Sequence, residues 1–173
     1  NSDAIVYVSS GEGTTSQGDF HEALNWSSRE KAPVIFHIEN NRYAISVPIS
    51  EQTSGESVYK ISTGYENLAR LSIDGCNYFE SLLAFKKSVD RARKGHGPTV
   101  IESNVVRLLP HSSSDDHRKY RTSEELDADK LRDPITLFIN GCLKKDQPEI
   151  LRHIKFFLLF FFKNKFKFRL ILI

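Results

Sequence analysis

Short apolar runs alternate with amphipathic segments along most of this chain. Residues 4–8 and 33–38 are apolar runs bounded by Gly or Asn, a pattern typical of buried parallel strands. Residues 17–28 between them have a helical pattern, so the three segments predict a βαβ unit. The same reasoning predicts strands at residues 71–74 and 99–106, and helices at residues 66–69, 78–94, 123–130 and 133–144. This alternation predicts an α/β fold with a mostly parallel sheet flanked by helices.

The segment 78–94 has the strongest helical periodicity in the chain. Its basic residues lie mostly opposite the apolar ones, and Gly95 and Pro98 are expected to end the helix. The apolar positions that we expect to face the core are Phe79, Leu82, Leu83, Phe85, Val89 and Ala92.

Charge and cysteine content narrow the class of protein. Residues 1–149 contain all 22 acidic residues and only 18 of the 24 basic ones, so no nucleic-acid binding is expected. The two cysteines, Cys76 and Cys142, are expected to be core thiols in a reducing compartment. We expect a bacterial cytoplasm or a mitochondrial matrix, since no targeting segment is visible. The abrupt start predicts that the natural protein extends further toward the N-terminus.

The last residues of the chain differ from the rest. Residues 150–173 contain seven Phe, six basic residues and no acid, and no helical period separates the charges. The longest uncharged apolar run is residues 156–162, too short for the roughly 20 residues of a membrane span. We therefore predict a domain at residues 1–145 and, at residues 146–173, an aberrant Phe- and Lys-rich tail from a non-native reading frame.

Two short motifs follow the first two predicted strands. Gly11-Glu12-Gly13 and Asn40-Asn41 are separated by the 26 residues 14–39, and the carboxyl ends of neighbouring parallel strands meet at one edge of a sheet. Glu12 offers a carboxylate, Asn41 an amide oxygen and Tyr43 a backbone carbonyl in a loop. Oxygen donors suit Mg²⁺, and free N–H groups at residues 13–15 suit phosphate. The alternative is a tight strand-to-helix turn followed by a capped loop.

A family resemblance supports the first interpretation. GEG followed by NN at this spacing is similar to the thiamine diphosphate motif, usually GDG and NN. The longer stretch GEGTTSQGDFHEALNWSSREKAPVIFHIENNRYAISVPISEQ resembles the α-type component of 2-oxo acid dehydrogenase complexes. The resemblance covers residues 3–145, and the His-Ser-x-Ser-Asp-Asp loop at residues 111–116 with Tyr120-Arg121 is most similar to the branched-chain members. It implies an incomplete thiamine diphosphate-binding fold.

The resemblance also implies roles for individual residues. The implied Mg²⁺ ligands are Glu12, Asn41 and the backbone carbonyl of Tyr43. The implied thiamine diphosphate contacts are Gly11, Glu12, Gly13, Thr14, Asn41 and His111. One position departs from the branched-chain pattern: some of those enzymes carry a phosphate-binding Arg before the Asn pair, whereas Glu39 stands there, as in pyruvate-type relatives.

The loop at residues 111–116 has two residues with implied roles. His111 would face the diphosphate and the reacting centre, where a histidine can stabilise charge or move protons. The alternative is an ordinary surface histidine, because the residues after it are loop formers. Ser112 occupies the position of a regulatory phosphoserine in animal relatives, and a phosphate there would repel the diphosphate.

Three hypotheses about function follow. The first is the α-type part of an enzyme that decarboxylates branched-chain 2-oxo acids and transfers the acyl group to a lipoyl carrier. Its partners would be a β-type subunit or domain, which completes the site, and a lipoyl acyltransferase component; no membrane partner is expected. The second is a pyruvate-type or other thiamine diphosphate enzyme. The third is a truncated fragment without activity.

Overall fold

The computed structural model describes residues 3–144, with side chains described up to residue 141. The chain divides into two compact units, Asn1–Pro134 and Ile135–Ile173, and the candidate site belongs to the first. Of the second unit only the helical residues up to Lys144 are described, so the predicted tail at residues 146–173 and the side chain of Cys142 lie outside the described residues. No helix in the described stretch has the length and apolar character needed to cross a membrane.

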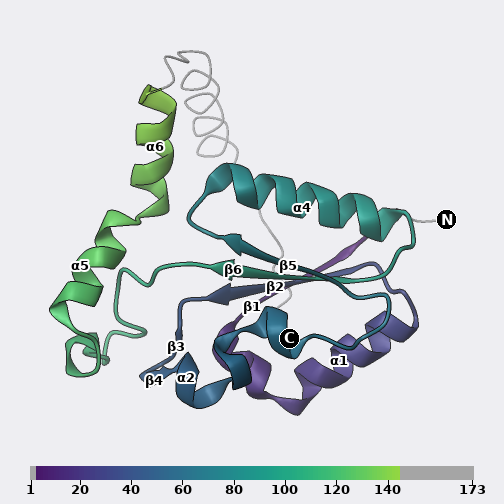
Figure 1. Ribbon diagram of the computed structural model, residues 1–173, viewed down its shortest axis with the longest axis horizontal. Helices are drawn as coiled ribbons and strands as arrows, with labels where there is room; N and C mark the ends of the chain where they lie inside the picture. The colour runs from purple at the N-terminus through teal and green to yellow at the C-terminus, as the bar shows by residue number, and fades with distance from the viewer. Residues whose placement is uncertain (1–2, 145–173) are drawn as a thin grey trace. The chain divides into compact units, whose positions relative to one another are not determined.

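A four-stranded parallel sheet forms the centre of the first unit (Figure 1). Its strand order is β1-β2-β6-β5, and every neighbouring pair is parallel. A separate antiparallel hairpin is formed by β3 and β4. The strand bounds are β1 Val6–Gly11, β2 Val34–Asn40, β3 Tyr43–Ala44, β4 Val47–Pro48, β5 Ala69–Asp74 and β6 Thr99–Asn104. The predicted α/β fold with a parallel sheet and flanking helices is confirmed.

Helices cover both faces of the sheet, with α4 on one face and α1 on the other (Figure 1). The helices are α1 Gly18–Arg29, α2 Ile49–Gln52, α3 Val58–Ile61, α4 Tyr78–Arg93, α5 Ser123–Leu131 and α6 Pro134–Lys144, and the 3-10 turns are η1 Glu12–Ser16, η2 Ser54–Glu56 and η3 His117–Lys119. Side chains of β2 alternate between the two faces, as the strand period requires. Phe36 packs with Leu24 of α1 and Val58 of α3, whereas Ile35 packs with Ala84 of α4.

The first strand differs from the prediction. The apolar run at residues 4–8 was expected to be a buried strand, but β1 spans Val6–Gly11 and lies at the edge of the sheet. Its side chains Val6, Tyr7 and Val8 are 53%, 52% and 41% exposed. An apolar run therefore identified the strand correctly but not its place in the sheet, because burial depends on neighbours that are distant in sequence.

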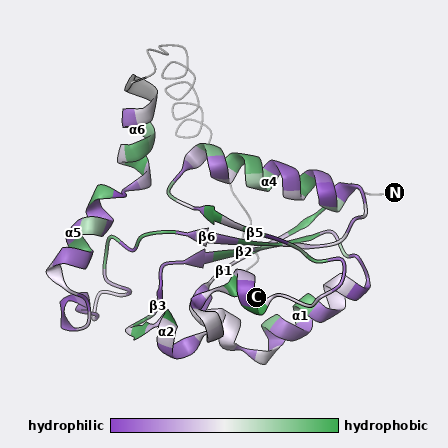
Figure 2. Cartoon of the chain, viewed as in Figure 1, coloured by the Kyte–Doolittle hydropathy of each residue, from purple (hydrophilic) through white to green (hydrophobic). Residues whose placement is uncertain are grey.

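Helix α4 confirms the predicted element but not all of its predicted core face. Asn77 caps its first turn by accepting hydrogen bonds from the N–H groups of Phe79 and Glu80. The fully buried stripe is Ala84, Ser88 and Ala92, with Phe85 and Val89 partly buried beside it. Apolar residues are concentrated in the N-terminal half of the helix (Figure 2), and three predicted core residues there are about half exposed or more: Phe79, Leu82 and Leu83.

Two connections were predicted wrongly. Residues 66–69 are not helical, because Asn67 adopts a left-handed conformation with φ of 65° and Ala69 already begins β5. The short helix in this region is α3 instead, where the Ser57 hydroxyl accepts a hydrogen bond from the Lys60 N–H group. The loop expected at Tyr43 is instead the β3–β4 hairpin, which is followed directly by α2. The cap that Ser57 provides to α3 is a local hydrogen bond, which leaves little trace in hydrophobic periodicity.

Candidate cofactor and metal site at the carboxyl edge of the sheet

The two predicted motifs meet at the carboxyl edge of the sheet. Strands β1 and β2 are parallel neighbours, with Gly11 opposite Glu39, so the residues that follow them emerge side by side. Glu12 opens the 3-10 turn after β1, and Asn41 follows the last residue of β2. The predicted βαβ arrangement of the motifs is therefore confirmed.

Glu12 is the most distinctive residue at this edge. Its side chain is buried, with the residue 1% exposed, and its Oε2 atom accepts a hydrogen bond of 3.2 Å from the Asn41 N–H group. Its Oε1 atom is buried and has no hydrogen-bond partner among the described residues. Desolvation by burial raises the pKa of the Glu12 carboxyl, although backbone N–H groups act in the opposite direction. A buried, unpaired carboxylate oxygen is costly, and a cation would satisfy it.

Asn41 and Tyr43 carry the other two predicted oxygen ligands, and the Asn41 N–H group already contacts Glu12. The Oδ1 atom of Asn41 accepts a hydrogen bond of 3.1 Å from the Tyr43 N–H group, which leaves this amide oxygen a second lone pair. Between them Arg42 has a left-handed φ of 73°, so the backbone turns sharply. Tyr43 does not lie in a loop as expected, because it begins β3 of the hairpin. This hairpin fixes the direction of the backbone that follows the Asn pair.

These donors fit a hard cation. No group of three or more His, Cys, Asp or Glu side chains is arranged to hold a metal ion anywhere in the described residues. A metal at the carboxyl edge would therefore depend on one carboxylate together with amide and backbone oxygens. That set suits Mg²⁺, which binds one or two carboxylates and completes its octahedron with water and phosphate oxygens.

The two glycines beside Glu12 have different surroundings. A Cβ atom on Gly11 would meet nothing within 4 Å, so this side of the turn is open to a ligand. A Cβ atom on Gly13 would lie 2.8 Å from the Ala44 Cβ atom, so Gly13 is required by the approach of β3. The two glycines therefore differ in that Gly11 borders open space, whereas Gly13 packs against the hairpin. Thr14 is exposed in the same 3-10 turn, and Gln52 donates a hydrogen bond of 2.9 Å to the Gly13 carbonyl.

The loop with His111 and Ser112 is held by its own polar groups. The His111 N–H group donates to Asp115 Oδ2 at 2.9 Å, and the Tyr120 hydroxyl donates to the same oxygen at 2.7 Å. The hydrogen bond from Tyr120 is the main reason why the pKa of Asp115 lies below its usual value. Ser112 and Ser114 share a hydrogen bond of 3.1 Å between their hydroxyls. His111 itself is exposed, and the described contacts do not join its imidazole to Glu12 or Asn41.

A cluster around the Tyr43 side chain was not predicted from the sequence. The Tyr43 hydroxyl donates to Glu125 Oε2 at 3.1 Å, and the guanidinium groups of Arg107 and Arg121 lie 5.4 and 5.2 Å from its ring centre. Arg121 is 5% exposed and forms ion pairs with Glu125 at 2.9 Å and Asp129 at 2.5 Å. Tyr120-Arg121 contributed to the family resemblance, but nothing in the local pattern showed that a buried arginine would pack beside Tyr43.

The cleft beside this cluster extends the candidate site. It has a volume of about 520 Å³, and its lining includes Asn41, Tyr43, Ser50, Val106 and Arg121. Glu39 contributes nothing to this cleft, because its carboxylate accepts a hydrogen bond of 3.0 Å from the Ser9 hydroxyl of β1. The observed partner of Glu39 is thus a side chain of the neighbouring strand.

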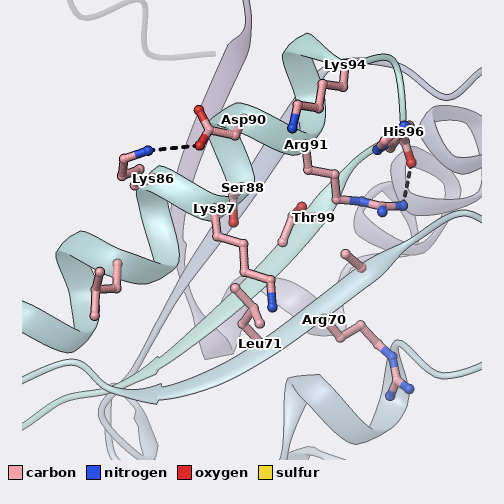
Figure 3. Close-up of a pocket in the computed structure, with 12 residues that line it drawn as sticks. Arg70, Leu71, Lys86, Lys87, Ser88, Asp90, Arg91, Lys94, His96 and Thr99 are labelled. Atoms are coloured by element: carbon pink, nitrogen blue, oxygen red, sulfur yellow. Dashed lines mark hydrogen bonds and ion pairs between the residues drawn. The ribbon is translucent and has the colours of Figure 1, made fainter.

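A larger cleft lies at the opposite end of the strands (Figure 3). It has a volume of about 860 Å³, and its lining includes Ala69 and Thr99, the first residues of β5 and β6. Arg91 in this cleft donates to the backbone carbonyls of Asn67 and His96, so it holds the turn after α4. None of the predicted site residues lines this cleft, so its size does not make it the candidate site.

Comparisons with known proteins identify the class to which this fold and site belong. Residues 1–147 match the family described as "Dehydrogenase E1 component", and the chain belongs to this family. It is 43% identical over 136 residues to the 2-oxoisovalerate dehydrogenase subunit alpha of Bacillus subtilis, covering 79% of this chain and 41% of that protein. It is 38% identical over 133 residues to the 3-methyl-2-oxobutanoate dehydrogenase subunit alpha of Mycobacterium tuberculosis, covering 77% and 36%.

A relative of a different type is about equally similar. The pyruvate dehydrogenase E1 component subunit alpha of Staphylococcus aureus is 41% identical over 141 residues, covering 80% of this chain and 37% of that protein. The chain thus spans about two fifths of the length of the curated relatives that it matches. E1 components depend on thiamine diphosphate, so the carboxyl-edge site is the place to consider for this cofactor.

Proposed function

We propose that this protein is the α-type component of a thiamine diphosphate-dependent 2-oxo acid dehydrogenase. The observation that carries the proposal is the buried, unpaired Oε1 atom of Glu12 beside Asn41 at the carboxyl edge of the sheet. Glu12, the Asn41 amide oxygen and the Tyr43 backbone carbonyl would hold Mg²⁺ there, and the bound ion would supply positive charge to balance the diphosphate of the cofactor. Gly11, Gly13 and Thr14 lie on the turn that faces the diphosphate.

The substrate is a branched-chain 2-oxo acid. Two of the relatives are named for 2-oxoisovalerate and 3-methyl-2-oxobutanoate, two names for the same branched-chain acid. Pyruvate is the second candidate, because the pyruvate-type relative is 41% identical and Glu39 stands where some branched-chain enzymes carry an Arg. Turnover of 3-methyl-2-oxobutanoate against pyruvate by the assembled enzyme distinguishes the two, and a kcat/KM at least tenfold higher for pyruvate would reverse the assignment.

The residues of this chain prepare and position the reacting groups. Bound thiamine diphosphate supplies the chemistry that stabilises a carbanion after loss of carbon dioxide. Glu12 must be ionised to bind Mg²⁺, so its raised pKa means that metal binding competes with protonation of this carboxyl group. His111, with its exposed imidazole, approaches the diphosphate and moves protons during decarboxylation or acyl transfer.

Two partners complete the activity. A β-type dehydrogenase subunit closes the site from the side that this chain leaves open at Gly11, and a lipoyl acyltransferase component accepts the acyl group. Phosphorylation of Ser112 would add about two negative charges at pH 7 to the loop that carries His111. Repulsion from the diphosphate would then disfavour the position that His111 needs, and activity would fall.

Calorimetric titration of thiamine diphosphate with Mg²⁺ tests the proposal in the full-length protein assembled with its β-type partner. We expect Glu12→Ala to weaken Mg²⁺-dependent binding by at least about 100-fold. Loss of a residue that only supports a metal ligand typically costs about 10–100-fold in affinity, and loss of the ligand itself should cost more. Glu22→Ala is the matched control, because Glu22 is an exposed glutamate of α1. Equal affinity of the two variants would refute the site.

A further inference from the structure

Glu102 is a buried carboxylate near the end of β6, the central strand beside β2. The residue is 1% exposed, yet each of its two carboxylate oxygens accepts two hydrogen bonds. A buried carboxylate is tolerated only when its oxygens are satisfied in this way. Four well-placed donors around one side chain show that the surrounding segments are arranged to meet it.

The four donors come from two different segments. Three belong to the start of α3: the Ser57 hydroxyl at 2.7 Å and the N–H groups of Val58 and Tyr59 at 2.8 and 3.0 Å. The fourth is the Nδ2 atom of Asn40 at 2.8 Å. Glu102 therefore connects the start of α3 to Asn40, the last residue of β2. Asn40 directly precedes Asn41, a candidate metal ligand.

Asn40 passes this restraint to the metal-binding turn. Its Nδ2 atom is engaged by Glu102, so its Oδ1 atom is held toward the Arg42 N–H group, from which it accepts a hydrogen bond of 3.0 Å. Arg42 needs this support because its φ of 73° is unfavourable for a residue with a side chain. Asn41, between them, is thereby held with its N–H group on Glu12 Oε2 and its Oδ1 atom at the Tyr43 N–H group.

We propose that Glu102 is a positioning residue for the Mg²⁺ site, acting through Asn40 on the turn that carries Asn41. This inference rests on the proposed function, since it concerns the same metal. The first Asn of the pair is thus a link between the sheet and the turn, and the second is the ligand. Loss of the link removes no metal ligand, but it lets Asn41 and Tyr43 move relative to Glu12. It therefore weakens metal binding and leaves the chemistry of the loaded enzyme intact.

Two substitutions separate this role from simple support of the fold. Asn40→Ala and Ser57→Ala each remove one donor to Glu102, but of the two side chains only that of Asn40 also hydrogen-bonds to the metal-binding turn. In the assembled full-length enzyme, we expect Asn40→Ala to raise the Mg²⁺ concentration for half-maximal thiamine diphosphate binding by about 10–100-fold. Ser57→Ala should change this Mg²⁺ concentration by less than about threefold, although the two variants should lower Tm by similar amounts.

Glu102→Gln tests the proposed residue itself. Glutamine keeps the size of the side chain but replaces one accepting oxygen by an NH₂ group. Depending on which oxygen is replaced, the hydrogen bonds from Ser57 and Tyr59, or those from Asn40 and Val58, are lost. We expect a rise of about 10–100-fold in the Mg²⁺ requirement, with kcat restored at saturating Mg²⁺. A fall in kcat that saturating Mg²⁺ does not restore would overturn a positioning role.

The Glu12→Ala variant keeps the two proposals distinguishable. If Glu12→Ala leaves the Mg²⁺ requirement unchanged, the proposed metal site itself is wrong. If Glu12→Ala abolishes the Mg²⁺ dependence while Asn40→Ala and Ser57→Ala have equal effects on it, only the positioning role of Glu102 is wrong. The Asn40 and Ser57 pair decides the question even where Glu102→Gln does not fold.

Discussion

The two segments that carry the candidate site residues are held in different ways. The turn at Glu12 and Asn41 is anchored in the sheet: Glu12 is buried, and the Asn pair is connected to Glu102 of the neighbouring strand. The segment 111–116 is exposed for most of its length, and its hydrogen bonds join it mainly to itself and to Tyr120. The first segment is fixed by the fold, and the second by local polar contacts.

The ionisable groups show the same difference. Burial raises the pKa of Glu12, which favours the neutral acid in the absence of a cation. In the loop, hydrogen bonds lower the pKa of Asp115 and of Asp116, with Tyr120 and Arg118 as the main donors, which favours the charged form. Among the described residues, the turn therefore leaves one buried oxygen of Glu12 unpaired, whereas the loop satisfies its own charges and leaves His111 exposed.

The largest effect that would sharpen this comparison is expected for His111→Ala. Because the imidazole is exposed, its removal should change the free energy of unfolding by no more than about 0.5 kcal/mol. Its removal should lower kcat of the assembled enzyme by about 10²–10⁴-fold, the usual contribution of a group that moves protons. Steady-state kinetics and urea unfolding measure the two quantities. Lys119→Ala, an exposed residue near the loop, is the control, and an equal kcat for both variants would remove His111 from the mechanism.

The next effect concerns the anchor that follows the loop. Arg121 is buried and bonded to Glu125, Asp129 and the Arg107 carbonyl, so Arg121→Met leaves two carboxylates without their partner. Since those carboxylates are partly exposed to water, we expect a destabilisation of about 2 kcal/mol, below the value for a fully buried pair. Urea unfolding of Arg121→Met beside Arg118→Met measures it. The exposed Arg118 pair should contribute little, and equal losses would show that the anchor is unimportant.

A smaller effect is expected at the turn itself. Gly13→Ala places a Cβ atom 2.8 Å from Ala44, so the hairpin must shift, and we expect a loss of about 1–2 kcal/mol. Gly11→Ala has no atom within 4 Å of the new Cβ and should leave the free energy of unfolding almost unchanged. Thermal unfolding of both variants tests this, and no loss in Gly13→Ala would mean that the turn adapts more easily than the contacts indicate.

The smallest effect is the pH dependence contributed by Glu12. Its folded-state pKa is raised above the ordinary value of 4.5, so the folded protein holds this proton more tightly than the unfolded chain. Stability should therefore decline as pH rises from about 4.5 to the raised pKa and stay level above it. The difference in Tm between the wild type and Glu12→Gln, measured across this range without Mg²⁺, isolates the contribution. A difference that is constant with pH would contradict the raised pKa.

Hydrophobic periodicity predicted the main elements because burial of apolar faces determines them. The parallel strands and the long helices α1, α4 and α5 lie within a few residues of their predicted positions. The edge position of β1 was missed, since residues 4–8 form an apolar run that is typical of a buried strand. The short helix α3 was missed because its position depends on Ser57 and on the distant Glu102.

The candidate site could be predicted only in part. Spacing along the chain placed Glu12 and Asn41 together, because parallel strands bring their carboxyl ends to one edge. The roles of Glu102 and Arg121 were invisible, since each acts through contacts between segments far apart in sequence. A residue that binds a ligand has a recognisable local pattern, whereas a residue that holds another residue in place is recognised only in three dimensions.

A crystal structure of the assembled enzyme with thiamine diphosphate and Mg²⁺ tests the central claim most directly. The account predicts a magnesium ion at about 2.1 Å from a carboxylate oxygen of Glu12 and from Asn41 Oδ1, with the diphosphate on the side of Gly11. It also predicts that Asn40 keeps its bond to Glu102. A metal bound elsewhere, with Glu12 Oε1 still unpaired, would contradict the account.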